Sequence, residues 1–309
     1  MRDEEEPGAR IVVLRALGLG DLLTAVPALR GLRAACPTAR IALAAPAALR
    51  PLALHVGAVD EVADTAPLAP LPPDLHGADL AVNLHGRGPQ STALLLDSSP
   101  RRLLSYGLEG GPVWRADEHE VHRWCRLLAA HGIACDPADL GLAPPPVPPP
   151  VAGAVVVHPG AAQASRRWPV DRWVAVTREL AQAGHHVVLS GGPDESELAA
   201  AVAASAGLPA DRVLAGRTDL LTLAALIASA RLLVSADTGV AHLATAYGTP
   251  SVVLFGPTPP TLWGPPPDRP QHRALWAGRT GDNFAPAPDP GLLELTVADV
   301  LQAAGQAFG

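Results

Sequence analysis

The chain has 309 residues, of which 48% are hydrophobic and 17% charged, so it can form one or two globular cores and lacks the composition of a disordered protein. Its net charge of −7 and scattered arginines argue against a nucleic-acid-binding surface, which needs a basic patch or stripe. The three cysteines, Cys36, Cys125 and Cys135, are too few and too widely spaced for a zinc cluster or a disulfide framework.

The first seven residues, MRDEEEP, are acidic and polar, the opposite of the basic start and apolar core of a signal peptide. No apolar run approaches the roughly 20 residues that span a bilayer. We therefore expect a cytoplasmic protein, for which peripheral contact with the inner face of a membrane stays open.

In the first half of the chain, short apolar segments alternate with helical ones. Strands are expected at residues 11–14, 41–44 and 78–84, and helices at about 21–35 and 118–131. The proline-rich run at 143–150 then predicts a semi-rigid linker, because proline withholds amide donors and favours an extended chain. We place an amino-terminal domain at 1–146 and a carboxy-terminal domain at 147–309, with a surface loop inside one large domain as the alternative.

The same alternation restarts after the linker. Strands are expected at 154–157, 186–190, 212–214 and 232–234, and helices at about 171–183, 195–204, 220–229 and 297–307. Alternation of this kind predicts parallel strands with crossover helices, hence two doubly wound, Rossmann-like α/β domains that face each other across a cleft.

Small and polar residues follow the first strand. Gly18 and Gly20 resemble the start of a dinucleotide-binding G-x-G-x-x-G pattern, but Leu23 stands at the third glycine, which disfavours an NAD site. Asp21 suits the N-cap of the following helix, at the carboxyl end of a parallel strand where doubly wound folds place ligands. This cap is kept as the alternative to the role that the family resemblance below implies.

Asn83, His85 and Arg87 follow a later strand of the same half. They suit contacts with hydroxyls or with an anionic group, and an ordinary surface turn is the alternative.

In the second half, polar residues again follow strands. The sequence HPGAA at 158–162 is followed by Arg166, and SGGPDE at 190–195 ends in Glu195. A carboxylate such as Glu195 can accept hydrogen bonds from a ligand, or stabilise the first turn of its helix.

The segment from Ser235 to Pro250, SADTGVAHLATAYGTP, predicts a strand, a tight turn and a helix. We expect Asp237 to cap the helix, which leaves other first-turn amides free to bind an anion. Thr238 adds a hydroxyl, Gly239 permits close approach, and His242 lies on the same helical face as Thr238. A plain helix cap with a packed histidine is the alternative.

The run DTGVAHLATAYGTP at 237–250, with FGP at 255–257, resembles the donor-site motif of glycosyltransferase family 9, the heptosyltransferase-like enzymes. The resemblance covers nearly all of the chain from Ile11 onward. It implies a GT-B fold, whose last helix often crosses back to the first domain. It also matches Gly20-Asp21 to the conserved glycine-aspartate of the family, with the aspartate as general base.

Further roles are implied by the same resemblance. Arg166 stands where the family has a lysine for the donor, and Glu195 matches its ribose-binding acid. The remaining donor contacts are assigned to Asp237, Thr238, Gly239 and His242, and the acceptor contacts to Gly20, Asn83, His85 and Arg87. Where related enzymes commonly carry an acid, this chain has Asn83. His119 and Glu120, followed by Arg123, resemble a family helix, and we favour a structural role for them.

The expected function is therefore inverting, metal-independent transfer of a sugar from a nucleotide-diphosphate sugar, with ADP-heptose favoured, to an acceptor hydroxyl. No cofactor is expected, and no D-x-D element suggests a metal. The partners are the nucleotide sugar and a glycan, glycolipid or small-molecule acceptor, with the lipopolysaccharide core suggested by resemblance. A nucleotide-sugar epimerase of related fold and a non-catalytic sugar-nucleotide-binding protein are the alternatives.

Overall fold

A computed structural model describes residues 8–308 and divides the chain into two compact units, Met1–Leu140 and Gly141–Gly309. The acidic start that argues against a signal peptide, residues 1–7, lies outside the described residues. The division precedes the expected one at 146/147, so the proline-rich segment belongs to the second unit. The Leu142 amide ties that segment there by donating to the carbonyl of Ala246 at 3.0 Å. Within residues 8–308, no helix is long and apolar enough to cross a membrane.

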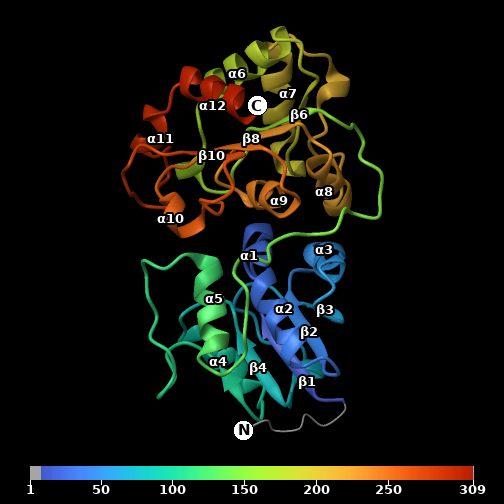
Figure 1. The fold of residues 1–309 in the computed structure, drawn as a ribbon, viewed down its shortest axis with the longest axis vertical. Helices are drawn as coiled ribbons and strands as arrows, with labels where there is room; N and C mark the ends of the chain where they lie inside the picture. The colour runs from blue at the N-terminus through green and yellow to red at the C-terminus, as the bar shows by residue number, and fades with distance from the viewer. Residues whose placement is uncertain (1–7, 309) are drawn as a thin grey trace. The chain divides into compact units, whose positions relative to one another are not determined.

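The first unit is built on a five-stranded parallel sheet in the order β3-β2-β1-β4-β5, with helices on both faces (Figure 1). Its strands are β1 Arg10–Leu14, β2 Arg40–Ala45, β3 Glu61–Asp64, β4 Leu80–Asn83 and β5 Leu103–Leu104. Its helices are α1 Leu19–Thr24, α2 Val26–Ala35, α3 Arg50–His55, α4 Gln90–Asp97 and α5 Glu120–Ala129. Val12 and Leu14 of β1 pack with Leu95 of α4, whereas α2 packs against α5.

The single helix expected at 21–35 is two helices in the structure. α1 ends at Thr24 and α2 begins at Val26, with Ala25 between them. Pro27 occupies the first turn of α2, where its missing amide is tolerated, but it cannot donate back into α1. A proline therefore divides the segment.

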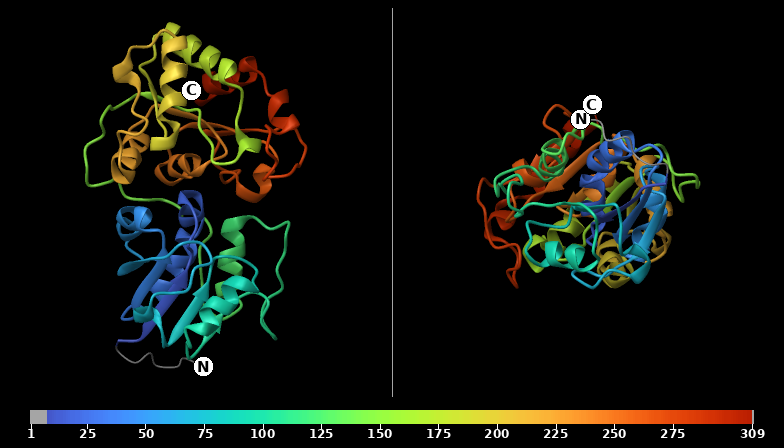
Figure 2. Two further views of the ribbon diagram at one scale, coloured as in Figure 1. Left: turned by 180° about the vertical axis from the view of Figure 1, so that it is seen from behind. Right: turned by 90° about the horizontal axis from the view of Figure 1, so that it is seen from below.

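The second unit repeats the architecture with a parallel sheet in the order β10-β9-β8-β6-β7 (Figure 2). Its strands are β6 Val155–His158, β7 Val187–Leu189, β8 Leu232–Ala236, β9 Ser251–Leu254 and β10 His272–Leu275. Its helices are α6 Val170–Gln182, α7 Ser196–Ser205, α8 Leu220–Ala228, α9 Gly239–Tyr247, α10 Pro260–Trp263, α11 Pro290–Glu294 and α12 Val297–Ala307. The expected pair of doubly wound α/β units is confirmed.

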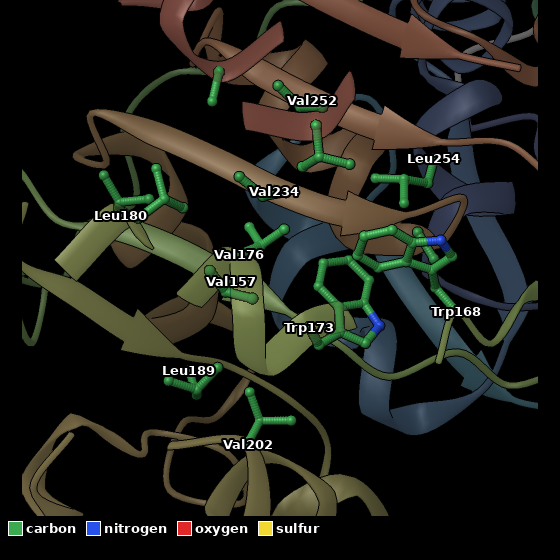
Figure 3. Packing of buried hydrophobic residues seen from close by; sticks show 14 of the residues in the cluster. Val157, Trp168, Trp173, Val176, Leu180, Leu189, Val202, Val234, Val252 and Leu254 are labelled. Atoms are coloured by element: carbon green, nitrogen blue, oxygen red, sulfur yellow. The ribbon is translucent and has the colours of Figure 1, made fainter. Parts of the chain in front are cut away.

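One face of the second sheet carries a large apolar core (Figure 3). Val157 and Val234 project from adjacent strands onto Trp173 and Val176 of α6, and Val202 of α7 joins them. These side chains are almost completely buried, and burial of each large apolar side chain contributes about 1.5–3 kcal/mol. The core fixes the strands whose ends carry the polar residues described below.

Two expectations about the second unit are corrected. The strand expected at 212–214 is reduced to a single bridge from Val213 to Leu189, because Ala210–Arg212 forms a 3-10 turn. Helix α12 has the expected bounds, but it packs on α6, β9 and β10 of its own unit, where Val300 and Ala304 enter the core. The expectation that it crosses back to the first unit is therefore not met.

Each sheet has a point where the strand order reverses, between β1 and β4 and between β6 and β8. Doubly wound sheets bind ligands outside the carboxyl ends of the strands at such points. Each unit therefore offers one place for a site.

Candidate functional site

The switch point of the first unit carries what we call the base site, made of Arg15, Asp21, His85 and Glu120. Arg15 directly follows β1, His85 follows β4, and Glu120 begins α5. The topology thus gathers side chains that lie up to 105 residues apart in the chain.

Asp21 lies at the third position of α1, and Gly18 is the N-cap. The prediction that Asp21 is the N-cap is wrong. Its Oδ2 instead accepts a hydrogen bond from the Gly18 amide at 3.2 Å, which closes the first turn from inside the helix. The side chain is 26% exposed, so a ligand can reach the carboxylate.

Arg15 is the centre of the base site and was missed by the sequence analysis. Its guanidinium is 1% exposed and donates through Nε to the main-chain oxygen of Asp21 at 3.0 Å. Through Nη2 it contacts Oδ1 of Asp21 at 3.2 Å and Oε1 of Glu120 at 2.9 Å. The sequence signal that could have identified Arg15 is its position immediately after an apolar strand. A guanidinium at such a position can become buried, and a buried guanidinium needs anionic partners.

Glu120 is a buried anion held between cations. Besides Arg15, it accepts from the indole Nε1 of Trp124 at 2.9 Å and pairs with Arg123. The Arg123 guanidinium lies over the Trp114 ring, 4.2 Å from its centroid. The structural role expected for Glu120 agrees with this complete burial.

Asn83 is the centre of a buried hydrogen-bond network behind this site. It is fully buried, and its Nδ2 donates to the hydroxyls of Ser91 and Ser105, each at 3.0 Å. Its Oδ1 accepts the His85 amide at 3.0 Å. The amide thus shapes the turn that presents His85, and the acceptor contact expected for Asn83 remains a prediction.

Of the other acceptor candidates, Gly20 and His85 lie near Asp21. His85 is half-buried, and its buried Nδ1 has no hydrogen-bond partner among the described residues. Burial, assisted by Arg15, lowers the pKa of His85, so the ring is neutral at pH 7. Gly20 lies in the first turn of α1, and Arg87 is exposed on the loop after β4. Their contacts with an acceptor remain predictions.

The switch point of the second unit carries what we call the anion site, formed by Arg166, Asp237, Thr238, Gly239 and Asn283. Helix α9 begins at Gly239, and its N-cap is Thr238, which makes no side-chain cap hydrogen bond. The prediction that Asp237 caps this helix is wrong. The Ala241 amide donates to the main-chain oxygen of Thr238 at 3.0 Å. Since no side chain caps the helix, the amides before Ala241 and the positive end of the helix dipole are available to an anion.

Arg166 lies beside this helix start. Its Nη1 is 3.3 Å from the main-chain oxygen of Asp237 and 3.5 Å from Oδ2 of the same residue. Its Nη2 and Nε donate to Oδ1 of Asn283 at 3.1 and 3.3 Å. Asn283 was not predicted, because it lies in a loop 117 residues away that no local pattern connects to Arg166.

Asp237 is 5% exposed, and burial raises its pKa to about 6 although Arg166 opposes the shift. The carboxylate is therefore ionised at neutral pH and holds the arginine in place. The guanidinium remains 27% exposed, which leaves part of its fork open.

Two further side chains belong to the surroundings of this helix. The Thr238 hydroxyl is buried and has no hydrogen-bond partner within the described part of the chain. The His242 ring lies edge-to-face with Trp263, at 6.0 Å between centroids. His242 thus packs against an aromatic ring one turn beyond Thr238.

Glu195 follows β7 and is anchored at its carboxylate. Its Oε2 accepts the Gly192 amide at 2.8 Å and lies 3.6 Å from Nε2 of His158. The other ring nitrogen of His158 is 3.0 Å from the Ser190 hydroxyl. A Cβ at position 160 would overlap the Glu195 carboxylate, so Gly160 is required for this packing. Burial lowers the pKa of His158, which keeps the ring neutral.

Comparison with known proteins gives a family for these features. The family model of glycosyltransferase family 9 (heptosyltransferase) matches residues 115–280, more than half of the chain. Lipopolysaccharide heptosyltransferase 3 of Escherichia coli is 37% identical over 113 residues, which are 36% of this chain and 33% of that protein. The chain thus aligns with about a third of the length of the curated relatives that it matches.

Solved structures extend the likeness to the whole fold. The structure of E. coli ADP-heptose lipopolysaccharide heptosyltransferase II superposes with a TM-score of 0.76 and 22% identity over 97% of this chain and 98% of that one. A family 9 glycosyltransferase from Veillonella parvula gives a TM-score of 0.75 and 21% identity over 98% of both chains. The expected GT-B fold is confirmed by this likeness.

Proposed function

The chain belongs to glycosyltransferase family 9, and from this membership we propose that it transfers a heptose from ADP-heptose to a hydroxyl of a lipopolysaccharide acceptor. The heptose is suggested by the names of proteins similar to this chain, which include a lipopolysaccharide heptosyltransferase and an ADP-heptose heptosyltransferase. Family membership favours transfer over the epimerase and the non-catalytic binding protein considered from the sequence.

The observation that carries the proposal is the uncapped start of α9 beside Arg166. A leaving nucleoside diphosphate gains negative charge as the bond to the sugar breaks. Free first-turn amides and a partly exposed guanidinium are preorganised to stabilise that charge. We propose that these groups, with Thr238 and His242 adjacent, take the place of a metal ion.

Asp21 supplies the complementary chemistry in the proposal. Its partly exposed carboxylate removes the proton of the acceptor hydroxyl as that oxygen attacks the anomeric carbon. Attack on the side opposite the leaving diphosphate inverts the anomeric configuration. His85, Arg87 and Gly20 are the proposed acceptor contacts.

Glu195 is the proposed ligand of the ribose. One carboxylate oxygen is anchored on the Gly192 amide, and a carboxylate has acceptor capacity left for vicinal hydroxyls. We propose that the enzyme works in the cytoplasm and meets its lipid-linked acceptor at the inner face of the membrane.

Thermal unfolding with a panel of nucleotides tests the donor site. ADP should raise the melting temperature more than UDP, GDP, dTDP or NAD, since a ligand of the native state at about 100 times its Kd adds roughly 2.7 kcal/mol.

A transfer assay tests the reaction. Incubation with ADP-heptose and a heptose-deficient lipopolysaccharide core should add one heptose, detected by mass spectrometry, in the presence or absence of EDTA. Stabilisation by NAD alone would overturn the transferase proposal, and loss of activity in EDTA would overturn its metal independence.

A further inference from the structure

Two carboxylates share one nitrogen of the buried Arg15 guanidinium. Nη2 lies 3.2 Å from Oδ1 of Asp21 and 2.9 Å from Oε1 of Glu120. The Asp21 side chain is 26% exposed, whereas the Glu120 side chain is 6% exposed. One anion of the pair therefore faces a ligand, and the other is enclosed in protein.

The shared cation is held rigidly. Besides its contacts with the two carboxylates, Arg15 donates to the main-chain oxygens of Asp21 and Leu84 and to the Thr24 hydroxyl. Its guanidinium lies 4.9 Å from the centroid of the Trp124 ring. An arginine fixed at every donor group cannot swing from one carboxylate to the other.

Glu120 is held as firmly from its own side. Trp124, one turn further along α5, donates to Oε1, and Arg123 pairs with Oε2. Arg123 in turn donates to the main-chain oxygens of Arg115 and Glu118. The Glu120 carboxylate is thus held in a fixed position against Arg15.

We propose that Arg15 is a positioning residue for Asp21, and that Glu120 balances the charge of Arg15 so that Asp21 stays basic enough to accept a proton. This inference rests on the proposed role of Asp21 as general base. A cation paired only with Asp21 would favour the ionised carboxylate and weaken it as a base, whereas Glu120 takes up part of that attraction. The attraction between Arg15 and Glu120 is strong because both side chains are buried away from water.

Other groups also face Asp21 and enter its pH dependence. Arg15 comes from the residue directly after β1, His85 from the loop after β4, and the Gly18 amide from the start of its own helix. Glu120 on α5 acts through Arg15. Protonation of His85 would add a positive charge, so the comparisons below are repeated in a His85→Gln background.

The test is the pH dependence of kcat for Glu120→Gln, which removes the charge but keeps an acceptor for Trp124. The acidic limb of the profile should move to lower pH by at least about half a unit. The plateau kcat should fall about two- to three-fold for each half unit of displacement, because the efficiency of a general base follows its basicity. The Kd for ADP should stay within about two-fold of wild type. A lower kcat with an unmoved acidic limb would show a merely structural role and overturn the proposal.

Glu120→Asp separates charge from packing, because it keeps the negative charge on a shorter side chain. Its acidic limb should remain at the wild-type pH even where its kcat is lower. A limb displaced to lower pH in Glu120→Asp overturns the charge balance, and this outcome can be measured even if Glu120→Gln does not fold.

Glu118→Gln is the matched control. Glu118 lies two residues before Glu120 and pairs with Arg126 at 2.7 Å, so its loss should leave the acidic limb in place. Asp21→Asn separates the two proposals. If Asp21→Asn stays active, the general-base role fails and the charge balance fails with it. If Asp21→Asn is inactive and Glu120→Gln shows no displaced limb, the charge balance alone fails.

Discussion

The base site of the first unit and the anion site of the second stand at equivalent places in two similar sheets, but they use charge differently. In the first unit, Arg15 is completely engaged by protein groups, and the exposed function is left to Asp21. In the second, Asp237 is buried, and the exposed function is left to Arg166 and an uncapped helix. The comparison teaches that the same switch point presents either an anion or a cation, according to which partner the fold buries.

Asp21→Asn removes the exposed anion of the base site and should have the largest effect. A side chain without a basic carboxylate should lower kcat by about 10²–10⁴-fold, because positioned general bases contribute about that much. Steady-state assays with ADP-heptose measure the loss, and calorimetry should give an unchanged Kd for ADP. Wild-type turnover in a folded Asp21→Asn protein would contradict the assignment.

Removal of the buried Glu120 carboxylate should show how much the ion pairs of the base site contribute to the free energy of unfolding. Glu120→Ala leaves two buried guanidinium groups short of a counterion, and breaking a buried pair from one side costs about 3–5 kcal/mol. Urea unfolding measures this cost. The control is Glu118→Ala, whose pair with Arg126 is more exposed and should cost about 1 kcal/mol. Equal losses in the two variants would refute the difference.

Arg166→Ala tests whether the exposed cation of the second unit serves a ligand. The Kd for ADP should rise about 10- to 100-fold, since hydrogen bonds to charged groups contribute about 1.5–3 kcal/mol. Arg167→Ala is the control, because the neighbouring guanidinium binds the main-chain oxygen of Ala161. Similar ADP binding by both variants would remove Arg166 from the donor site.

Asp237→Asn should have a smaller effect, which changes the pH dependence of the free energy of unfolding. Burial raises the pKa of Asp237 to about 6 from 3.8, so its contribution to stability is complete below pH 3.8 and is lost as the pH rises through 6. Between pH 5.0 and 7.5, wild type should lose about 1.4 kcal/mol relative to Asp237→Asn. Urea unfolding at both pH values tests this, and a constant difference between the two proteins would contradict the shift.

The sequence predicts those parts of the fold that depend on continuous local patterns. The apolar runs gave β1 and β6 to within a residue, because strands of a parallel sheet are buried on both faces. The bounds of α12 follow from its apolar periodicity and from the Thr296 cap. Where one proline or one short turn decides the outcome, as at Pro27 and Ala210–Arg212, pattern alone was insufficient.

The sites were predicted in composition but not in geometry. Asp237 was expected to be an N-cap, and an N-cap was the alternative role for Asp21, since aspartate favours that position. The backbone instead places Gly18 and Thr238 there. Arg15 and Asn283 were missed because their partners are distant in sequence. Burial of Asn83 followed from three hydroxyls that only the folded chain brings around it.

The separation of Arg15 from Glu120 has a consequence for synthesis of the protein on the ribosome. The cation emerges first, and its buried counterion follows 105 residues later. A nascent chain that has not yet delivered α5 would have to bury an arginine without Glu120, at a cost that favours leaving the segment unfolded. We expect the amino-terminal unit to resist co-translational folding until α5 has left the exit tunnel, and truncations before Glu120 to be substrates for proteases and chaperones.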